Sequence, residues 1–63
     1  MKYSIKIKTT RTKYGTANAT VSYYYNYSRH EFRWAFNFYN DFKTFGTEEE
    51  LLEYVNSKYE IVK

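Results

Sequence analysis

Aromatic residues alternate with other side chains through residues 32–39, and this pattern constrains the fold more than any other feature of the chain. Successive side chains of a β-strand point to opposite faces, so a period of two predicts a strand with one buried face. One face of this strand carries Phe32, Trp34, Phe36 and Phe38, and the other carries Arg33, Ala35, Asn37 and Tyr39. A face covered with large rings needs a second layer of structure against it.

Two earlier segments alternate in the same way. Residues 17–27 place Ala17, Ala19, Val21, Tyr23, Tyr25 and Tyr27 on one face, and residues 2–9 do the same with Tyr3, Ile5 and Ile7. The polar segment between them contains Gly15 and predicts a hairpin loop, and residues 28–31 predict a turn. A hairpin about that turn pairs Tyr27 with Phe32, Tyr25 with Trp34, Tyr23 with Phe36 and Val21 with Phe38. We therefore expect Tyr23, Tyr25 and Tyr27 to belong to the core.

The C-terminal third predicts a loop over residues 40–46 and then a helix. Thr47 and Glu50 form a capping box, and the acidic run Glu48–Glu50 suits the positive end of a helix dipole. An apolar stripe at helical spacing follows, made of Leu51, Leu52, Val55 and Tyr59. Residues 59–63 are β-prone, and we consider a short terminal strand there, beside residues 2–9.

These elements predict an α+β fold of one domain over residues 1–63. It is a three-stranded antiparallel β-meander with one C-terminal helix packed on its aromatic face, in the order β-β-β-α, with the short fourth strand at the C-terminus as an option. With 63 residues and no cysteine, the chain must build its core from large side chains, and it has nine Tyr, five Phe and one Trp.

Residues with catalytic or metal-binding chemistry are sparse. His30 is the only histidine and falls in a predicted turn, helix capping accounts for Glu48–Glu50, and two glycines are too few for a glycine-rich phosphate loop. We expect a non-enzymatic protein with no catalytic residue, no metal site and no cofactor. The sequence also contains no run typical of a signal peptide or membrane span, so we expect a cytoplasmic protein without a membrane partner.

Charge is distributed unevenly along the chain. Residues 1–30 contain six basic residues and no acidic one, whereas residues 31–63 contain four basic and seven acidic residues. The basic residues of the strands fall on the sheet face opposite the aromatic face, and Arg11 and Lys13 extend this face at the tip of the first hairpin. Such an asymmetry indicates an interaction surface.

The favoured interpretation is a small nucleic-acid-binding module that uses this open face and the first hairpin loop, with DNA preferred over RNA. Lys and Arg neutralise phosphates, Arg and Asn read base edges, and Tyr stacks on unpaired bases. The candidate binding residues are Lys6, Lys8, Arg11, Lys13, Tyr24, Asn26, Arg33 and Asn37. The β-β-β-α order with a threonine-capped helix resembles the small DNA-binding domains at the N-termini of tyrosine integrases, a likeness that implies a DNA target but transfers no site residue.

Two other interpretations stay open. One is a small inhibitor or adaptor of the phage or mobile-element type, which binds a host protein through a sheet edge, the basic face or the acidic side of the helix (Glu49, Glu53 and Glu60). The other is that the lysines only keep the sheet soluble and its edges unpaired. The chain is expected to be a monomer, or a homodimer formed by edge-strand pairing.

Overall fold

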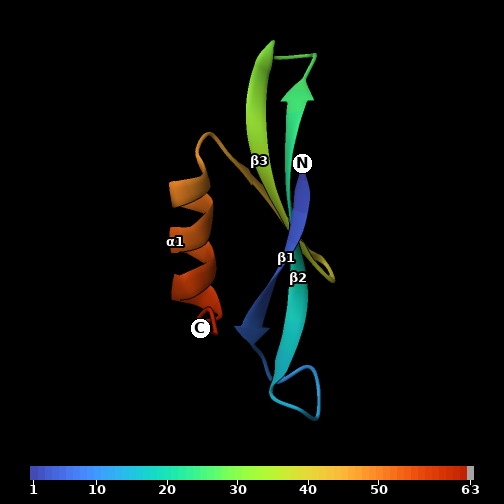
Figure 1. The fold of residues 1–63 in the computed structure, drawn as a ribbon, viewed down its shortest axis with the longest axis vertical. Helices are drawn as coiled ribbons and strands as arrows, with labels where there is room; N and C mark the ends of the chain where they lie inside the picture. Colours follow the sequence, from blue (N-terminus) through green and yellow to red (C-terminus); the bar gives the residue numbers. More distant parts are fainter. Residues whose placement is uncertain (63) are drawn as a thin grey trace.

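The chain forms a four-stranded antiparallel sheet with one helix against one of its faces (Figure 1). The structure is a computed structural model and describes residues 1–62. The strands are β1 (Lys2–Lys8), β2 (Thr16–Asn26), β3 (Glu31–Phe38) and β4 (Asp41–Phe45), in the spatial order β1-β2-β3-β4, and the helix is α1 (Glu48–Lys58). The α+β class, the meander and the C-terminal helix on the aromatic face are therefore as the sequence predicts.

β4 is the element that the sequence prediction missed, because residues 40–46 were expected to form a loop. It has only five residues, and Asp41, Lys43 and Phe45 share one face, so no apolar alternation marks it. A tight turn makes it possible: Tyr39 adopts a left-handed backbone conformation with φ of 53°, and Phe38 pairs directly with Asp41. The element order is thus β-β-β-β-α.

The C-terminal segment lies beside β1, as the prediction of a terminal strand requires, but it forms a single bridge there and no strand. Ile61 pairs with Ile7 in an isolated antiparallel bridge. The Lys8 amide donates to the Glu60 carbonyl at 3.0 Å, and the Val62 amide donates to the Lys6 carbonyl at 2.9 Å. Lys63, the last residue of the predicted strand, lies outside the described residues. The segment therefore covers part of the outer edge of β1.

The faces of β2 and β3 agree with the prediction, but the pairing is shifted by two residues. Tyr25 lies opposite Phe32, and Tyr23 lies opposite Trp34. The shift arises in the turn, where the side-chain oxygen of Asn26 accepts hydrogen bonds from the amides of Ser28 and Arg29 at 3.0 and 3.2 Å. This places residues 27–30 in the loop. An even shift keeps every side chain on its predicted face.

The core occupies only the half of the sheet that α1 covers. Its fully enclosed side chains are Ile7, Ala19, Val21, Phe36, Phe38, Leu51 and Val55. At 3.3 Å per residue the 11 residues of β2 span roughly 36 Å, whereas the 11 residues of α1 span roughly 16 Å. Figure 1 shows the β2–β3 hairpin extending beyond the start of α1. The expectation that Tyr23, Tyr25 and Tyr27 belong to the core is therefore wrong, and the same holds for Phe32, since the helix is too short to cover these rings.

Polar contacts fix the helix to the sheet. The Asp41 carboxylate accepts hydrogen bonds from the Tyr59 hydroxyl at 2.5 Å, from the Tyr54 hydroxyl at 3.0 and 3.1 Å, and from the Lys58 ammonium at 3.0 Å. At the start of the helix, the Thr47 hydroxyl accepts from the Glu50 amide at 3.2 Å, as predicted for an N-cap. The first residue of β4 and the C-terminal half of α1 are thereby held together.

Candidate nucleic-acid interface and neighbouring surfaces

The sheet face opposite α1, called here the open face, carries most of the predicted binding residues. The strand register arranges it in rows: Lys6 beside Asn18, Ser4 beside Thr20, Asn37 and Phe42, and Tyr24 beside Arg33. Lys2, Lys6 and Lys8 form a basic column along β1, and all are exposed. Glu31 is the only acidic residue in the strand registers of this face.

The predicted residues do not form one patch. Lys8 is paired with Thr16 at one end of β2, and Asn26 is at the other end, so the two lie roughly 33 Å apart along the strand. A lower group contains Lys6, Lys8, Arg11 and Lys13; an upper group contains Tyr24, Asn26 and Arg33; and Asn37 lies between them.

The lower group presents its cations to solvent. Lys6 is exposed and has no ion pair within the described chain, while Lys8 forms an exposed ion pair with Glu60 at 2.8 Å. The Arg11 guanidinium lies 4.7 Å from the centre of the Tyr39 ring, and the Lys13 ammonium lies 5.3 Å from that of Tyr14. Rings below these cations restrict their position without neutralising their charge.

The upper group is more involved in structure. Arg33 donates to the Thr44 hydroxyl at 3.2 Å and lies 3.6 Å from the Glu31 carboxylate, which also pairs with Arg29 at 3.2 Å. Asn26 caps the β2–β3 turn through its side-chain oxygen. These contacts give Arg33 and Asn26 a structural role. Tyr24 is the exposed ring on this part of the open face.

Sequence reasoning missed a second surface, on the helix side of the sheet beyond the N-terminal start of α1. The first residue of β1, Lys2, pairs with Ser22, and the last residue of β4, Phe45, pairs with Trp34. Beyond these points β2 and β3 continue as a two-stranded ribbon. We call residues 23–34, including the turn, the aromatic arm.

Five rings pack along the helix-side face of the aromatic arm: Tyr23, Tyr25, Tyr27, Phe32 and Trp34. Tyr23 and Phe32 are stacked, with ring centres 5.2 Å apart and planes within 7° of parallel. None of the rings is fully buried, and Tyr27 and Phe32 are 80% and 55% exposed. The mismatch between an 11-residue strand and an 11-residue helix was the sequence signal that could have revealed this surface.

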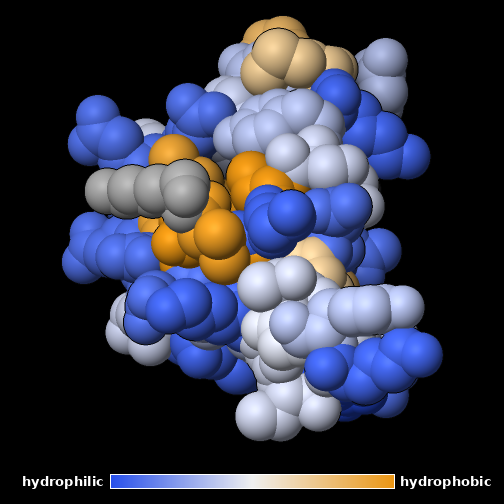
Figure 2. All heavy atoms as spheres, turned by 60° about the horizontal axis from the view of Figure 1, so that its bottom comes forward, coloured by the Kyte–Doolittle hydropathy of each residue, from blue (hydrophilic) through white to orange (hydrophobic). Residues whose placement is uncertain are grey.

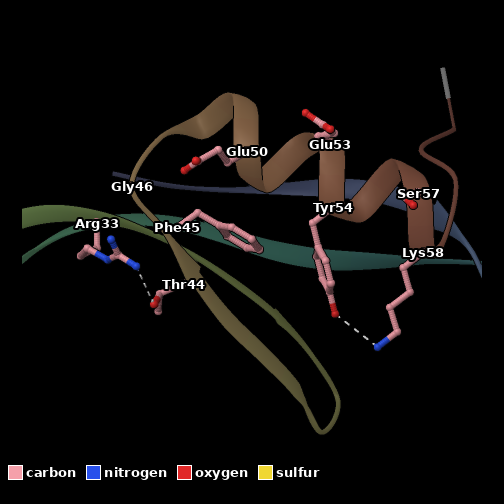
Figure 3. Close-up of a pocket in the computed structure, with 9 residues that line it drawn as sticks. All are labelled: Arg33, Thr44, Phe45, Gly46, Glu50, Glu53, Tyr54, Ser57 and Lys58. Carbon is pink, nitrogen blue, oxygen red and sulfur yellow. Dashed lines mark hydrogen bonds between the residues drawn. The ribbon is translucent and has the colours of Figure 1, made fainter.

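A groove runs between the outer edge of β4 and α1 (Figure 3). It has a volume of about 800 Å³ and is lined by Arg33, Thr44, Phe45, Gly46, Glu50, Glu53, Tyr54, Ser57 and Lys58. Phe45 and Tyr54 face each other at 5.4 Å between ring centres, and Figure 3 shows the Glu50 carboxylate directed toward Gly46 while Glu53 points away from the groove. The groove therefore combines two aromatic rings with six polar or charged residues.

The perturbed pKa values in the described chain have structural causes. Burial alone would raise the pKa of Asp41, but hydrogen bonds from Tyr59, Lys58 and Tyr54 outweigh this and lower it below its ordinary value. Burial and the hydrogen bond to the Glu48 carboxylate, 2.7 Å long, raise the pKa of Tyr3 to about 12. Residues 1–62 contain no group of His, Cys, Asp or Glu arranged to hold a metal ion.

The end of the molecule with the first hairpin and the C-terminus is mostly hydrophilic (Figure 2). Hydrophobic residues gather there in one small area beside the C-terminus. Ile61 and Val62 are half-buried at that end, in a shallow pocket with Lys8, Asn56 and Glu60. The exposed aromatic rings of β2 and β3 lie at the opposite end of β2.

Comparisons of the chain with protein-family models, curated proteins and solved structures gave no match. The fourth strand also removes the likeness in element order to the integrase domains, which rests on three strands before the helix. In the described part of the chain, no helix is both long and apolar enough to cross a membrane.

Proposed function

We propose that this protein is a small non-enzymatic nucleic-acid-binding module, with DNA preferred over RNA, that binds through the basic column of β1 and the β1–β2 loop. The observation that carries the proposal is the acid-poor open face with exposed Lys2, Lys6 and Lys8 along one strand. Alternate residues of a strand lie about 6.7 Å apart on the same face, so these cations form a line along which a phosphate backbone can lie.

The alternative explanation, that the lysines only protect the sheet from aggregation, accounts less well for their position. Protective charges are most useful along the unpaired edge of a strand. Here the outer edge of β1 is partly covered, since Lys6 and Lys8 exchange backbone hydrogen bonds with the C-terminal segment. Arg11 and Lys13 lie outside the strands altogether, in the loop that extends the same basic region.

Fluorescence anisotropy with labelled single-stranded and duplex DNA and RNA tests the proposal. If Lys2, Lys6, Lys8, Arg11 and Lys13 each contact one phosphate, the logarithm of the binding constant should fall with the logarithm of salt concentration at a slope of about −3.5 to −4.5. Lys6→Glu should weaken binding to every sequence and reduce the magnitude of the slope by about one or more.

Lys43→Glu is the matched control, because it makes the same change of net charge at an exposed residue of β4 that shares its face with the helix. It should leave the affinity close to that of the unsubstituted protein. No measurable affinity at low salt, or equal losses from the two substitutions, would contradict the proposal.

A further inference from the structure

The aromatic arm needs an explanation that the folding of the chain does not supply. Tyr27 and Phe32 are 80% and 55% exposed, and α1 does not extend over them. Exposed aromatic clusters on small proteins mark interaction sites. The question is which partner has the chemistry to cover this one.

Charge and ring geometry favour nucleobases. The charged groups of the arm are Arg29, Glu31 and Arg33, so guanidinium groups outnumber carboxylates. The N-terminal ammonium also approaches the base of the arm, 3.4 Å from the carbonyl oxygen of Tyr23. Both arginines pair with Glu31, which leaves the ribbon with a small net positive charge. Such a ribbon with exposed ring faces suits a polyanion with unpaired bases, because these bases stack on aromatic side chains.

A second copy of this chain fits less well. If each ring has 150–250 Å² to bury, the free parts of Tyr27 and Phe32 amount to roughly 200–340 Å² per chain. A symmetric contact would bury about twice that, which is well below the 1,200–2,000 Å² of a stable protein interface. The other three rings add little, since each is already half-buried.

The arm is also continuous with the proposed basic face. Tyr24 and Arg33 are directly paired on its open side, and Lys2 ends the basic column at its base. A nucleic-acid strand that follows the β1 lysines can therefore reach the ribbon. Beyond Tyr23 and before Trp34, neither edge of the ribbon is paired with another β-strand among the described elements.

We propose that the aromatic arm is a stacking site for unpaired bases, so that the preferred ligand is single-stranded or locally melted nucleic acid. This inference rests on the proposed function, and it adds a site on the opposite face of the sheet. Tyr27 and Phe32 are the two rings of the arm exposed enough to hold a base. Tyr25 packs against both of them, Tyr23 packs against Phe32, and Trp34 packs against Tyr23.

The test compares a labelled oligothymidylate with a labelled mixed-sequence duplex of the same length. Stacking on one aromatic ring supports a loss of roughly 5- to 150-fold on its removal, so Phe32→Ala and Tyr27→Ala should each reduce single-strand affinity by that order. Duplex affinity should stay within about twofold, and Tyr27→Phe should retain single-strand binding because the ring is kept.

Phe42→Ala is the comparison variant, since Phe42 is a similarly exposed strand phenylalanine that lies outside the arm, on the open face beside Asn37. It should not lower the affinity for the single strand more than the affinity for the duplex. Circular dichroism checks that each variant is folded. Trp34 is the only tryptophan and lies 4.6 Å from the Tyr23 ring, so saturation with the single strand should change its emission.

Each of the following outcomes overturns the inference. If the arm variants bind the single strand as well as the unsubstituted protein does, or lose both ligands equally, the arm is not a stacking site. If the protein binds duplex and Lys6→Glu weakens this binding while the arm variants change nothing, the proposed function stands and this inference fails. If the protein binds no nucleic acid, both fail. A dimer in light scattering that Phe32→Ala dissociates would assign the arm to a second copy.

Discussion

Replacement of Asp41 by asparagine is the most informative perturbation of the fold. The Asp41 side chain is only 14% exposed and accepts hydrogen bonds from Tyr54, Tyr59 and Lys58. Asparagine has nearly the same shape, but it removes the negative charge that strengthens all of these bonds. The substitution therefore measures how strongly the charge holds β4 to α1.

The magnitude follows from the two tyrosine hydroxyls. A hydrogen bond to a charged group contributes about 1.5–3 kcal/mol and a neutral one about 0.5–1.5 kcal/mol, so each loses about 1–1.5 kcal/mol. Solvent screens the half-exposed Lys58, so the tyrosines dominate. Asparagine also avoids the desolvation of a buried carboxylate, which brings the expected net loss to about 2 kcal/mol. For a domain of this size, that lowers the melting temperature by about 8–16 °C.

The pH dependence identifies the cause. The pKa of Asp41 is lower in the folded protein than in the unfolded chain, so its contribution is fully present above the unfolded value of about 3.9. It is lost as the pH falls through the folded-state pKa. The gap in melting temperature between the unsubstituted protein and Asp41→Asn should therefore be constant from pH 7 to pH 5 and close below pH 4.

Thermal melts monitored by circular dichroism over this pH range provide the measurement. Glu53→Gln removes one exposed carboxylate of α1 that has no ion pair in the described structure, and it should change the melting temperature little. A gap that is absent at pH 7, or that persists undiminished at pH 2, would refute the reasoning.

Two further substitutions probe the helix-covered half of the sheet. Trp34→Ala should cost about 2–3 kcal/mol of unfolding free energy, because Trp34 is half-buried at the edge of the core. Phe36→Ala, which removes a fully buried aromatic ring, should cost about 3–5 kcal/mol. Urea titration of the two variants tests this order, and an equal loss would contradict it. Tyr3→Phe removes the bond to Glu48 and should cost about 1–2 kcal/mol at neutral pH. Since the folded-state pKa of Tyr3 is about 12, against about 10 in the unfolded chain, this contribution should disappear as the pH rises from 10 to 12 in melts of the two proteins.

The alternation of residues 17–27 and 32–38 was sufficient to predict which side chains share a face. Successive side chains of a strand point to opposite faces whichever residues of the neighbouring strand they pair with. It could not predict the register itself, which depends on how Asn26 hydrogen-bonds within the turn. β4 was not predictable by the same reasoning, since Asp41 and Lys43 occupy the face that in the other strands is apolar. Asp41 is tolerated there because Tyr54 and Lys58 of α1 and its C-cap residue Tyr59 hydrogen-bond to it. These are tertiary contacts without a local sequence signal.

The same limit applies to the candidate site. Charge counting located the basic face, but one-dimensional patterns treat every apolar position of a strand as buried, and so Tyr27 and Phe32 were assigned to a core that ends before them. Whether a strand residue is buried depends on the length of the helix that packs on the strand as well as on the strand itself. A helix of 11 residues covers less than half the length of a strand of 11 residues. Comparing their lengths, which the sequence does permit, separates core rings from free rings.

The division between a covered and an uncovered half makes the functional proposals testable without loss of the fold. Phe36, Leu51, Val55 and the Asp41 contacts hold the covered half together, and none of them involves Lys6, Tyr27 or Phe32. Lys6→Glu and Tyr27→Ala remove exposed groups, so they should change stability by about 0.5 kcal/mol or less. Phe32→Ala also removes the packing of its ring against Tyr23 and Tyr25, and it should cost about 1–2 kcal/mol. A loss of binding in a variant that is folded at the assay temperature therefore reports on recognition, and the Lys6 and Phe32 variants distinguish contact with phosphates from contact with bases.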